Sequence, residues 1–93
     1  MDKIKRHEEI CSKMHEIYKS KNLAYGDSFG KSFDNWGLAA AMVRMGDKWN
    51  RITNLAKHPE VDYGDEAITD SLLDLSNYAI MTIMELEKQN GDD

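Results

Sequence analysis

The stretch that decides the fold lies near the C-terminus, where residues 65–89 read DEAITDSLLDLSNYAIMTIMELEKQ. Apolar residues recur in this stretch at steps of three and four, which is the period of a helix with one apolar face. They are Ile68, Leu72, Leu75, Ala79, Ile83 and Leu86. Charges are sparse between Leu72 and Leu86, so we expect this helix to be covered on two faces. Asp62 or Asp65 is the expected cap of its first turn.

The helical period extends over most of the remaining chain. It predicts a first helix over residues 2–20 and a second over residues 35–57, with Asp34 or Asn35 as the cap of the second. Residues 21–34 are dense in turn formers and are expected to form a loop. Since no alternating pattern predicts a strand, we expect a single all-α domain over residues 1–93. Its predicted form is a three-helix subunit that forms a helical bundle with another copy.

The composition indicates a small cytoplasmic protein that oligomerises. The chain has 93 residues, of which 41% are hydrophobic and 31% charged, and its formal net charge is −5. An acidic chain is a poor binder of polymeric nucleic acid, and no apolar run approaches the roughly 20 residues that span a membrane. Cys11 is the single cysteine, which excludes an internal disulfide and fits a reducing compartment. Six Met, two Trp, four Tyr and two Phe exceed what one short chain can bury, so we expect a homo-oligomer, a dimer or higher.

Acidic residues on the third predicted helix form a candidate metal site. Glu66, Asp70, Asp74 and Asn77 follow one another at steps of four, four and three and therefore share one helix face. Stacked carboxylates repel each other in water, and a divalent cation reverses that effect. Carboxylate oxygens are ligands that Mg²⁺ prefers. The alternative interpretation is a solvated polar face beside the positive end of the helix dipole.

Basic residues on the second predicted helix form a candidate phosphate site. Arg44, Lys48 and Arg51 share one face, with Asp47 at its edge. Arg binds phosphate with two parallel hydrogen bonds and Lys adds a mobile charge, so this face suits a phosphate group. The alternative is an exposed face stabilised by salt bridges, in which Asp47 pairs with Arg44 or Arg51. The pattern leaves both interpretations open.

The predicted loop contains side chains that suit a nucleotide base. Tyr25, Phe29 or Phe33 could stack on a base, and Ser28 adds a hydroxyl group beside two glycines. The alternative is that these aromatic side chains pin the loop to the bundle.

Three elements in this order resemble the nucleotide modification associated domain, type one. They are Tyr25-Gly26-Asp27-Ser28, the run from Met42 to Arg51, and the run from Asp70 to Ala79. That family is common in phages and bacteria and is similar to the MazG-like all-α NTP pyrophosphatases. Those enzymes are helical dimers or tetramers that use acidic pairs on two helices to hold Mg²⁺ for hydrolysis between the α and β phosphates. This chain has Arg44 where one of those acids would stand, so the resemblance implies nucleotide binding more strongly than hydrolysis.

The leading hypothesis is a nucleotide-binding protein, phage-encoded, that sequesters a nucleotide or nucleotide signal without hydrolysis. Its pocket is expected between the second and third predicted helices and shared by two subunits. The expected nucleotide contacts are Tyr25, Ser28, Phe29, Arg44, Lys48, Arg51 and Asn77, and the expected Mg²⁺ ligands are Asp47, Asp70 and Asp74. One alternative is an Mg²⁺-dependent NTP pyrophosphatase. A second is a non-catalytic oligomeric adaptor that binds proteins through its Met-rich helices.

Overall fold

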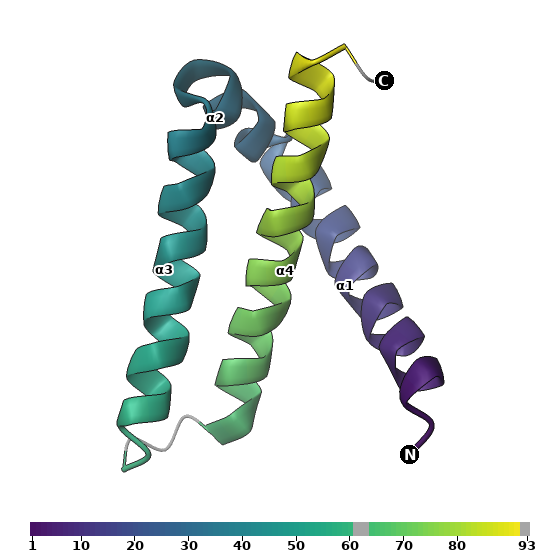
Figure 1. Ribbon diagram of the computed structural model, residues 1–93, viewed down its shortest axis with the longest axis vertical. Helices are drawn as coiled ribbons and strands as arrows, with labels where there is room; N and C mark the ends of the chain where they lie inside the picture. Colours follow the sequence, from purple (N-terminus) through teal and green to yellow (C-terminus); the bar gives the residue numbers. More distant parts are fainter. Residues whose placement is uncertain (61–63, 92–93) are drawn as a thin grey trace.

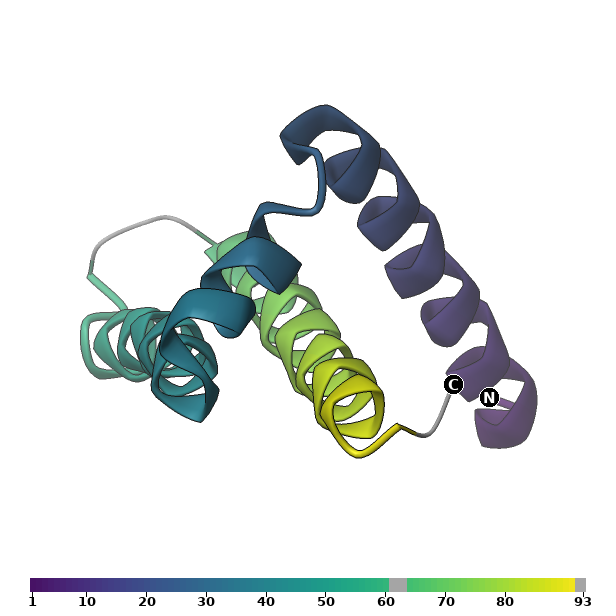
Figure 2. The same ribbon diagram turned by 90° about the horizontal axis from the view of Figure 1, so that it is seen from above.

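A computed structural model describes residues 1–60 and 64–91, and within them it holds four helices and no strand. The helices are α1 (Lys3–Tyr25), α2 (Ser28–Trp36), α3 (Leu38–Lys57) and α4 (Gly64–Gln89). The antiparallel helices α3 and α4 form a hairpin, and α1 and α2 lie against one side of it (Figures 1 and 2). The predicted all-α fold is confirmed. Among the described residues, no helix has both the length and the apolarity that a membrane crossing requires.

The predicted loop over residues 21–34 is wrong, because it contains the end of one helix and most of another. α1 continues past Ser20 to Tyr25, and Gly26 and Asp27 alone make the turn into α2. Both residues adopt left-handed backbone angles, with φ of 59° and 56°. The Gly26 N–H donates a hydrogen bond to the Asn22 carbonyl oxygen and so caps α1. This stretch therefore does contain a turn, as its residues predict, but the turn needs only Gly26 and Asp27.

The short helix α2 contributes the centre of the core. Phe29 and Phe33 are buried together with Ala41 of α3, and Met45, Tyr78 and Met81 pack around them. Gly30 in the first turn allows a close approach, since a Cβ atom there would lie 2.5 Å from Oδ2 of Asp27 unless that side chain moved. This helix has only nine residues, and Gly26 just before it and Gly30 within it favour a turn, so the sequence pattern predicts a loop here instead.

The junction between α2 and α3 corrects the predicted start of the second helix. Asp34 and Asn35, the predicted caps, lie in the last turn of α2, and α3 begins at Leu38. Gly37 separates the two helices with φ 64° and ψ −151°, a combination that is essentially restricted to glycine. The predicted cap at Asp62, and the side chain of Asp65, lie outside the described part of the chain.

Helix α4 contacts α1, α2 and α3, but its apolar stripe is not the face that they cover. The side chains that α4 buries are Ser71, Leu73, Asn77 and Thr82, whereas Leu72 and Ile83 are about half exposed. Ser71 and Thr82 can be buried because each hydroxyl donates to a carbonyl of its own helix, at 2.9 and 2.6 Å. The polar face of α4 therefore points into the chain, toward the site described next.

Candidate functional site

A cavity of about 420 Å³ lies among the four helices of one chain. It is lined by Tyr18, Lys21, Asn22, Tyr25, Ser28, Phe29, Arg44, Lys48, Asp74, Asn77, Tyr78 and Met81. Six of the seven predicted nucleotide contacts and one predicted metal ligand are in this set. The structure thus brings together residues from the two helices that were expected to form the pocket, and it adds a wall from α1.

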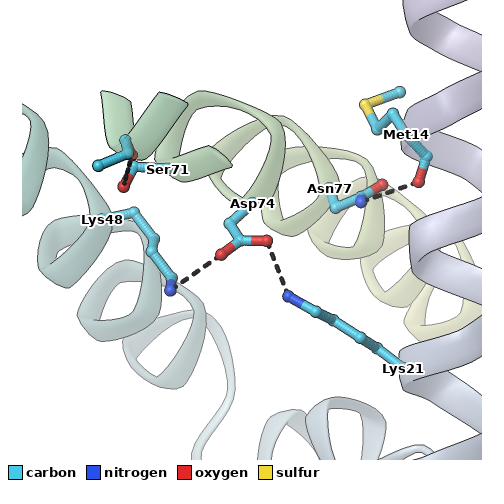
Figure 3. A network of polar contacts seen from close by, with 7 residues as sticks. Met14, Lys21, Lys48, Ser71, Asp74 and Asn77 are labelled. Carbon is cyan, nitrogen blue, oxygen red and sulfur yellow. Dashed lines mark hydrogen bonds and ion pairs between the residues drawn. The ribbon is translucent and has the colours of Figure 1, made fainter. Parts of the chain in front are cut away.

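Asp74 lies between α1 and α3 and forms an ion pair with a lysine of each (Figure 3). Its Oδ1 lies 2.9 Å from Nζ of Lys21, and its Oδ2 lies 3.1 Å from Nζ of Lys48. Burial raises the pKa of the Asp74 carboxyl group, but hydrogen bonds from the two lysines outweigh burial and leave the pKa below its ordinary value. The same hydrogen bond raises the pKa of Lys21. At neutral pH the group is therefore an ionised carboxylate held between two ammonium groups.

The cavity is locally cationic in an acidic protein. Lys21, Arg44 and Lys48 line it, and Asp74 is the carboxylate among the described lining residues. Three positive charges thus face one negative charge, although the whole chain has a net charge of −5. Because Asp74 is already paired with both lysines, Arg44 is the cation of this set that has no ion pair within the described part of the chain. An anionic group can gain charge-assisted hydrogen bonds here from Arg44 and both lysines.

Lys21 is a site residue that the sequence pattern missed. It lies beyond residue 20, where the sequence predicts the end of the first helix, so the pattern assigns it to a loop and to no helix face. Once α1 is continued to Tyr25, Tyr18, Lys21 and Tyr25 follow at steps of three and four and share one face. A basic residue between two tyrosines on one helix face was the signal that could have found it.

The aromatic residues of the cavity divide into a packed pair and an open pair. Phe29 is only 7% exposed and packs on Tyr78, with ring centroids 5.6 Å apart. Tyr25 is 67% exposed, and Tyr18, two turns earlier on α1, is half-buried. The two tyrosines therefore have ring surface available to a ligand. Phe29 instead packs most of its surface against the core, which agrees with the alternative that the aromatic side chains pin this segment to the bundle. Phe33 is fully buried and lies outside the cavity lining.

Asn77 both lines the cavity and fastens α1 to α4. Its Nδ2 donates a hydrogen bond of 3.0 Å to the backbone carbonyl oxygen of Met14, and the side chain is nearly buried (Figure 3). One donor of this amide is thus committed to the fold.

A second, more polar cavity of about 410 Å³ adjoins the first and shares Lys48 and Asp74 with it. Its lining also includes Arg51, Glu66, Ala67, Asp70 and Ser71. Arg51 and Asp70 are therefore placed beside the main cavity rather than in it. Asp47 is exposed and lines neither cavity.

The predicted magnesium ligands are not gathered around one point. Within the part of the chain that the structure describes, no three His, Cys, Asp or Glu side chains cluster as metal ligands would. Both oxygens of Asp74 face ammonium groups, which is the wrong neighbour for a cation. The residues present thus do not fit a resident Mg²⁺ ion between Asp47, Asp70 and Asp74.

Comparison with known proteins places the chain in a family. Residues 21–86 match the family described as nucleotide modification associated domain 1, and the chain belongs to it. The matched segment begins at Lys21 and includes every other charged residue that lines the two cavities. No curated protein and no solved structure matches the chain.

Proposed function

We propose that this member of the nucleotide modification associated domain 1 family binds a single nucleotide in the main cavity and holds it without hydrolysis. The observation that carries the proposal is the concentration of Lys21, Arg44 and Lys48 around one cavity of an acidic chain. Such segregation of charge suits a small anion better than a polymer, since a polymer would meet the acidic remainder of the surface.

The phosphate group is assigned to the side of the cavity where Arg44 and Lys48 face Lys21. Arg44 donates two parallel hydrogen bonds to phosphate oxygens, and the two ammonium groups turn from Asp74 toward the added charge. Asp74 keeps the lysines close to the cavity before the ligand arrives, because each N–O distance is already about 3 Å. The same carboxylate competes with a phosphate for both ammonium groups, so its attraction to them opposes binding.

The base is assigned to the tyrosine side of the cavity. Tyr25 and Tyr18 offer ring faces on α1, and Ser28 lies at the start of α2, where its hydroxyl can pair with a sugar or base. Stacking on an aromatic ring tolerates any base, so the site discriminates between bases through its hydrogen bonds. A cavity of this volume lies within the range of small-molecule sites.

Binding is favoured over hydrolysis by the arrangement of the acidic residues. A pyrophosphatase of the MazG-like kind requires carboxylates that together hold Mg²⁺, and here Asp74 is paired with lysines while Asp70 lines the neighbouring cavity. A protein that holds a nucleotide without hydrolysing it acts by sequestration, and this is the role we propose. The proposed location is the cytoplasm, or the host cytoplasm if the protein is phage-encoded. The subunit is proposed to complete a helical bundle with a second copy.

The test is a thermal-shift screen with nucleoside mono-, di- and triphosphates, cyclic nucleotides and ADP-ribose derivatives. A ligand at 100 times its Kd adds about 2.7 kcal/mol to the free energy of unfolding, so a binder is readily seen. We expect a shift in EDTA, and no release of NMP and pyrophosphate when Mg²⁺ is added. Mg²⁺-dependent turnover would instead establish the enzyme. Absence of a shift with every nucleotide would leave the protein-binding adaptor.

A further inference from the structure

The two adjoining cavities differ in the sign of their charge. The charged residues that line the main cavity, among those described, are Lys21, Arg44, Lys48 and Asp74. Those of the second cavity are Lys48, Arg51, Glu66, Asp70 and Asp74. Three positive groups against one negative group give the main cavity a net charge of +2, whereas two against three give the second cavity −1. A ligand that extends from the main cavity into the second therefore leaves a positive environment for a negative one.

One oxyanion group is enough to engage both lysines of the main cavity. The Asp74 carboxylate already does so, since its two oxygens lie 2.9 Å from Nζ of Lys21 and 3.1 Å from Nζ of Lys48. The terminal phosphate of a nucleotide presents three acceptor oxygens, so it can accept hydrogen bonds from both ammonium groups and from the Arg44 guanidinium. A single phosphate group thus engages every cation that lines the described part of the main cavity.

A longer phosphate chain extends toward the second cavity. The base is assigned to the tyrosine side of the main cavity, so further phosphates lie beyond Lys48 and Asp74, the residues that the two cavities share. Arg51 adds one positive charge there, against the two further carboxylates of Glu66 and Asp70. Neither carboxylate forms an ion pair within the described part of the chain. Both are therefore unneutralised charges that repel an added phosphate.

We propose that the site selects nucleoside monophosphates over the corresponding di- and triphosphates. This inference rests on the proposed function, and it names the class of nucleotide that the main cavity holds. A monophosphate carries roughly two negative charges at neutral pH, which balance the net charge of the main cavity. Each further phosphate adds about one negative charge and places it near the carboxylates of the second cavity.

The selectivity comes from repulsion of the wrong ligand, and Glu66 and Asp70 are the residues that supply it. They line only the second cavity, so they do not contact a monophosphate held in the main one. A monophosphate also has no bond between phosphate groups. The absence of hydrolysis then follows from the class of ligand as well as from the arrangement of the acidic residues.

Isothermal titration in EDTA tests the selectivity. The probes are the mono-, di- and triphosphates of adenosine, guanosine, cytidine and uridine, together with the methyl ester of each monophosphate. For the base that binds most tightly, we expect the monophosphate to bind about 10-fold or more tightly than the triphosphate, with the diphosphate between them. The methyl ester carries only about one negative charge and should also bind more weakly than the monophosphate.

A double variant, Glu66→Gln with Asp70→Asn, tests the cause of the selectivity. Both side chains are exposed, so the fold does not depend on them. Their neutralisation should reduce the preference for the monophosphate over the triphosphate by about 3-fold or more, with a much smaller effect on the monophosphate itself. Glu85→Gln with Glu87→Gln is the matched control, since it removes two carboxylates from α4 outside both cavity linings and should preserve the preference.

The outcomes separate this inference from the proposed function. A triphosphate that binds as tightly as its monophosphate or more tightly, in EDTA or with Mg²⁺, would overturn the inference and leave the nucleotide site in place. A preference that the Glu66→Gln, Asp70→Asn variant retains in full would also overturn it, because these carboxylates would not be its cause. Absence of binding by every probe would overturn the proposed function and the inference together.

Discussion

Nζ of Lys21 lies 2.9 Å from Oδ1 of Asp74, although 53 residues separate them in the chain. This pair links α1 to α4, and the pair between Asp74 and Lys48 links α4 to α3. One carboxylate thus connects three helices at the wall of the cavity. The proposed binding of a ligand in this cavity is therefore expected to be coupled to stability through Asp74.

Replacement of Asp74 by Asn is expected to destabilise the free protein by about 1–2 kcal/mol. The amide oxygen can still accept a hydrogen bond from one lysine, but the amide NH₂ group faces the ammonium group of the other, so both ion pairs are lost at a side chain that is only 20% exposed. Glu16→Gln is the matched control, since its pair with Lys19 is exposed and spans 3.5 Å, and it should cost less than about 0.5 kcal/mol. Urea unfolding measures both values. Equal effects of the two substitutions would contradict the role given to Asp74.

The pH dependence of stability follows from the same ion pairs. The folded-state pKa of Asp74 is lowered from 3.8, so its contribution is present above that value and is lost as pH falls through the lower folded pKa. The folded-state pKa of Lys21 is raised from 10.5, so its contribution is complete below that value and is lost as pH rises through the higher folded pKa. The difference in free energy of unfolding between wild type and Asp74→Asn should therefore be constant near neutrality and shrink at both extremes. A difference that peaks in acid would contradict this assignment.

Asn77→Asp tests the polar connection between α1 and α4. The substitution removes the amide donor and directs a carboxylate oxygen at the Met14 carbonyl oxygen, which now lies 3.0 Å from Nδ2. We expect a loss of about 1–3 kcal/mol and faster amide hydrogen exchange in α1 than in α3. Asn50→Asp, at an exposed position of α3, is the control and should change neither quantity. Unchanged exchange in α1 would show that Asn77 does not hold it.

Gly37→Ala tests the junction between α2 and α3. The backbone there has φ 64° and ψ −151°, and a residue with a Cβ atom is strained in this conformation. We therefore expect the substitution to lower the free energy of unfolding by about 1–3 kcal/mol. Gly26→Ala is the comparison, because its left-handed angles of 59° and 42° are open to other residues at about 1–2 kcal/mol. Thermal unfolding should rank Gly37→Ala as the more damaging change. The reverse order would place the essential turn between α1 and α2 instead.

Arg44→Ala tests the proposed phosphate contact. Loss of a two-pronged, charge-assisted hydrogen bond should weaken nucleotide binding by roughly 10- to 100-fold. Lys57→Ala is the matched control, since it removes a positive charge from the same helix at its last turn, away from the cavity lining. Isothermal titration of both variants gives the comparison. Equal weakening would mean that only the net charge of the protein matters.

The sequence pattern predicts the helical class correctly, and it finds the two C-terminal helices because their apolar period is long and clear. It does not find α2, whose nine residues include a glycine, and it ends α1 one and a half turns early. It also predicts that other helices cover the apolar stripe of α4, whereas in the structure they cover the opposite, more polar face. The packing of Asn77, Ser71 and Thr82 inside the chain depends on hydrogen bonds to particular carbonyl groups, which no periodicity reveals.

The candidate site was predicted in part for the same reason. Arg44, Lys48 and Asp74 come from the two helices with the clearest pattern, and the structure brings them to one cavity. Lys21 lies in residues 21–34, for which the sequence predicts a loop. Whether a carboxylate binds a metal ion or pairs with a lysine depends on which side chains other helices place opposite it. The spacing of residues along one helix does not contain that information.

The most direct test of the account is a titration of the best-binding nucleotide from the screen, in EDTA, onto wild-type protein and Asp74→Asn. If the phosphate is held by Lys21, Arg44 and Lys48, removal of the competing carboxylate frees two lysines, and affinity should rise by about 3- to 10-fold. The wild-type protein should bind one ligand per chain without metal. Binding that requires Mg²⁺ in the wild type and disappears in Asp74→Asn would contradict the account, because Asp74 would then be a metal ligand.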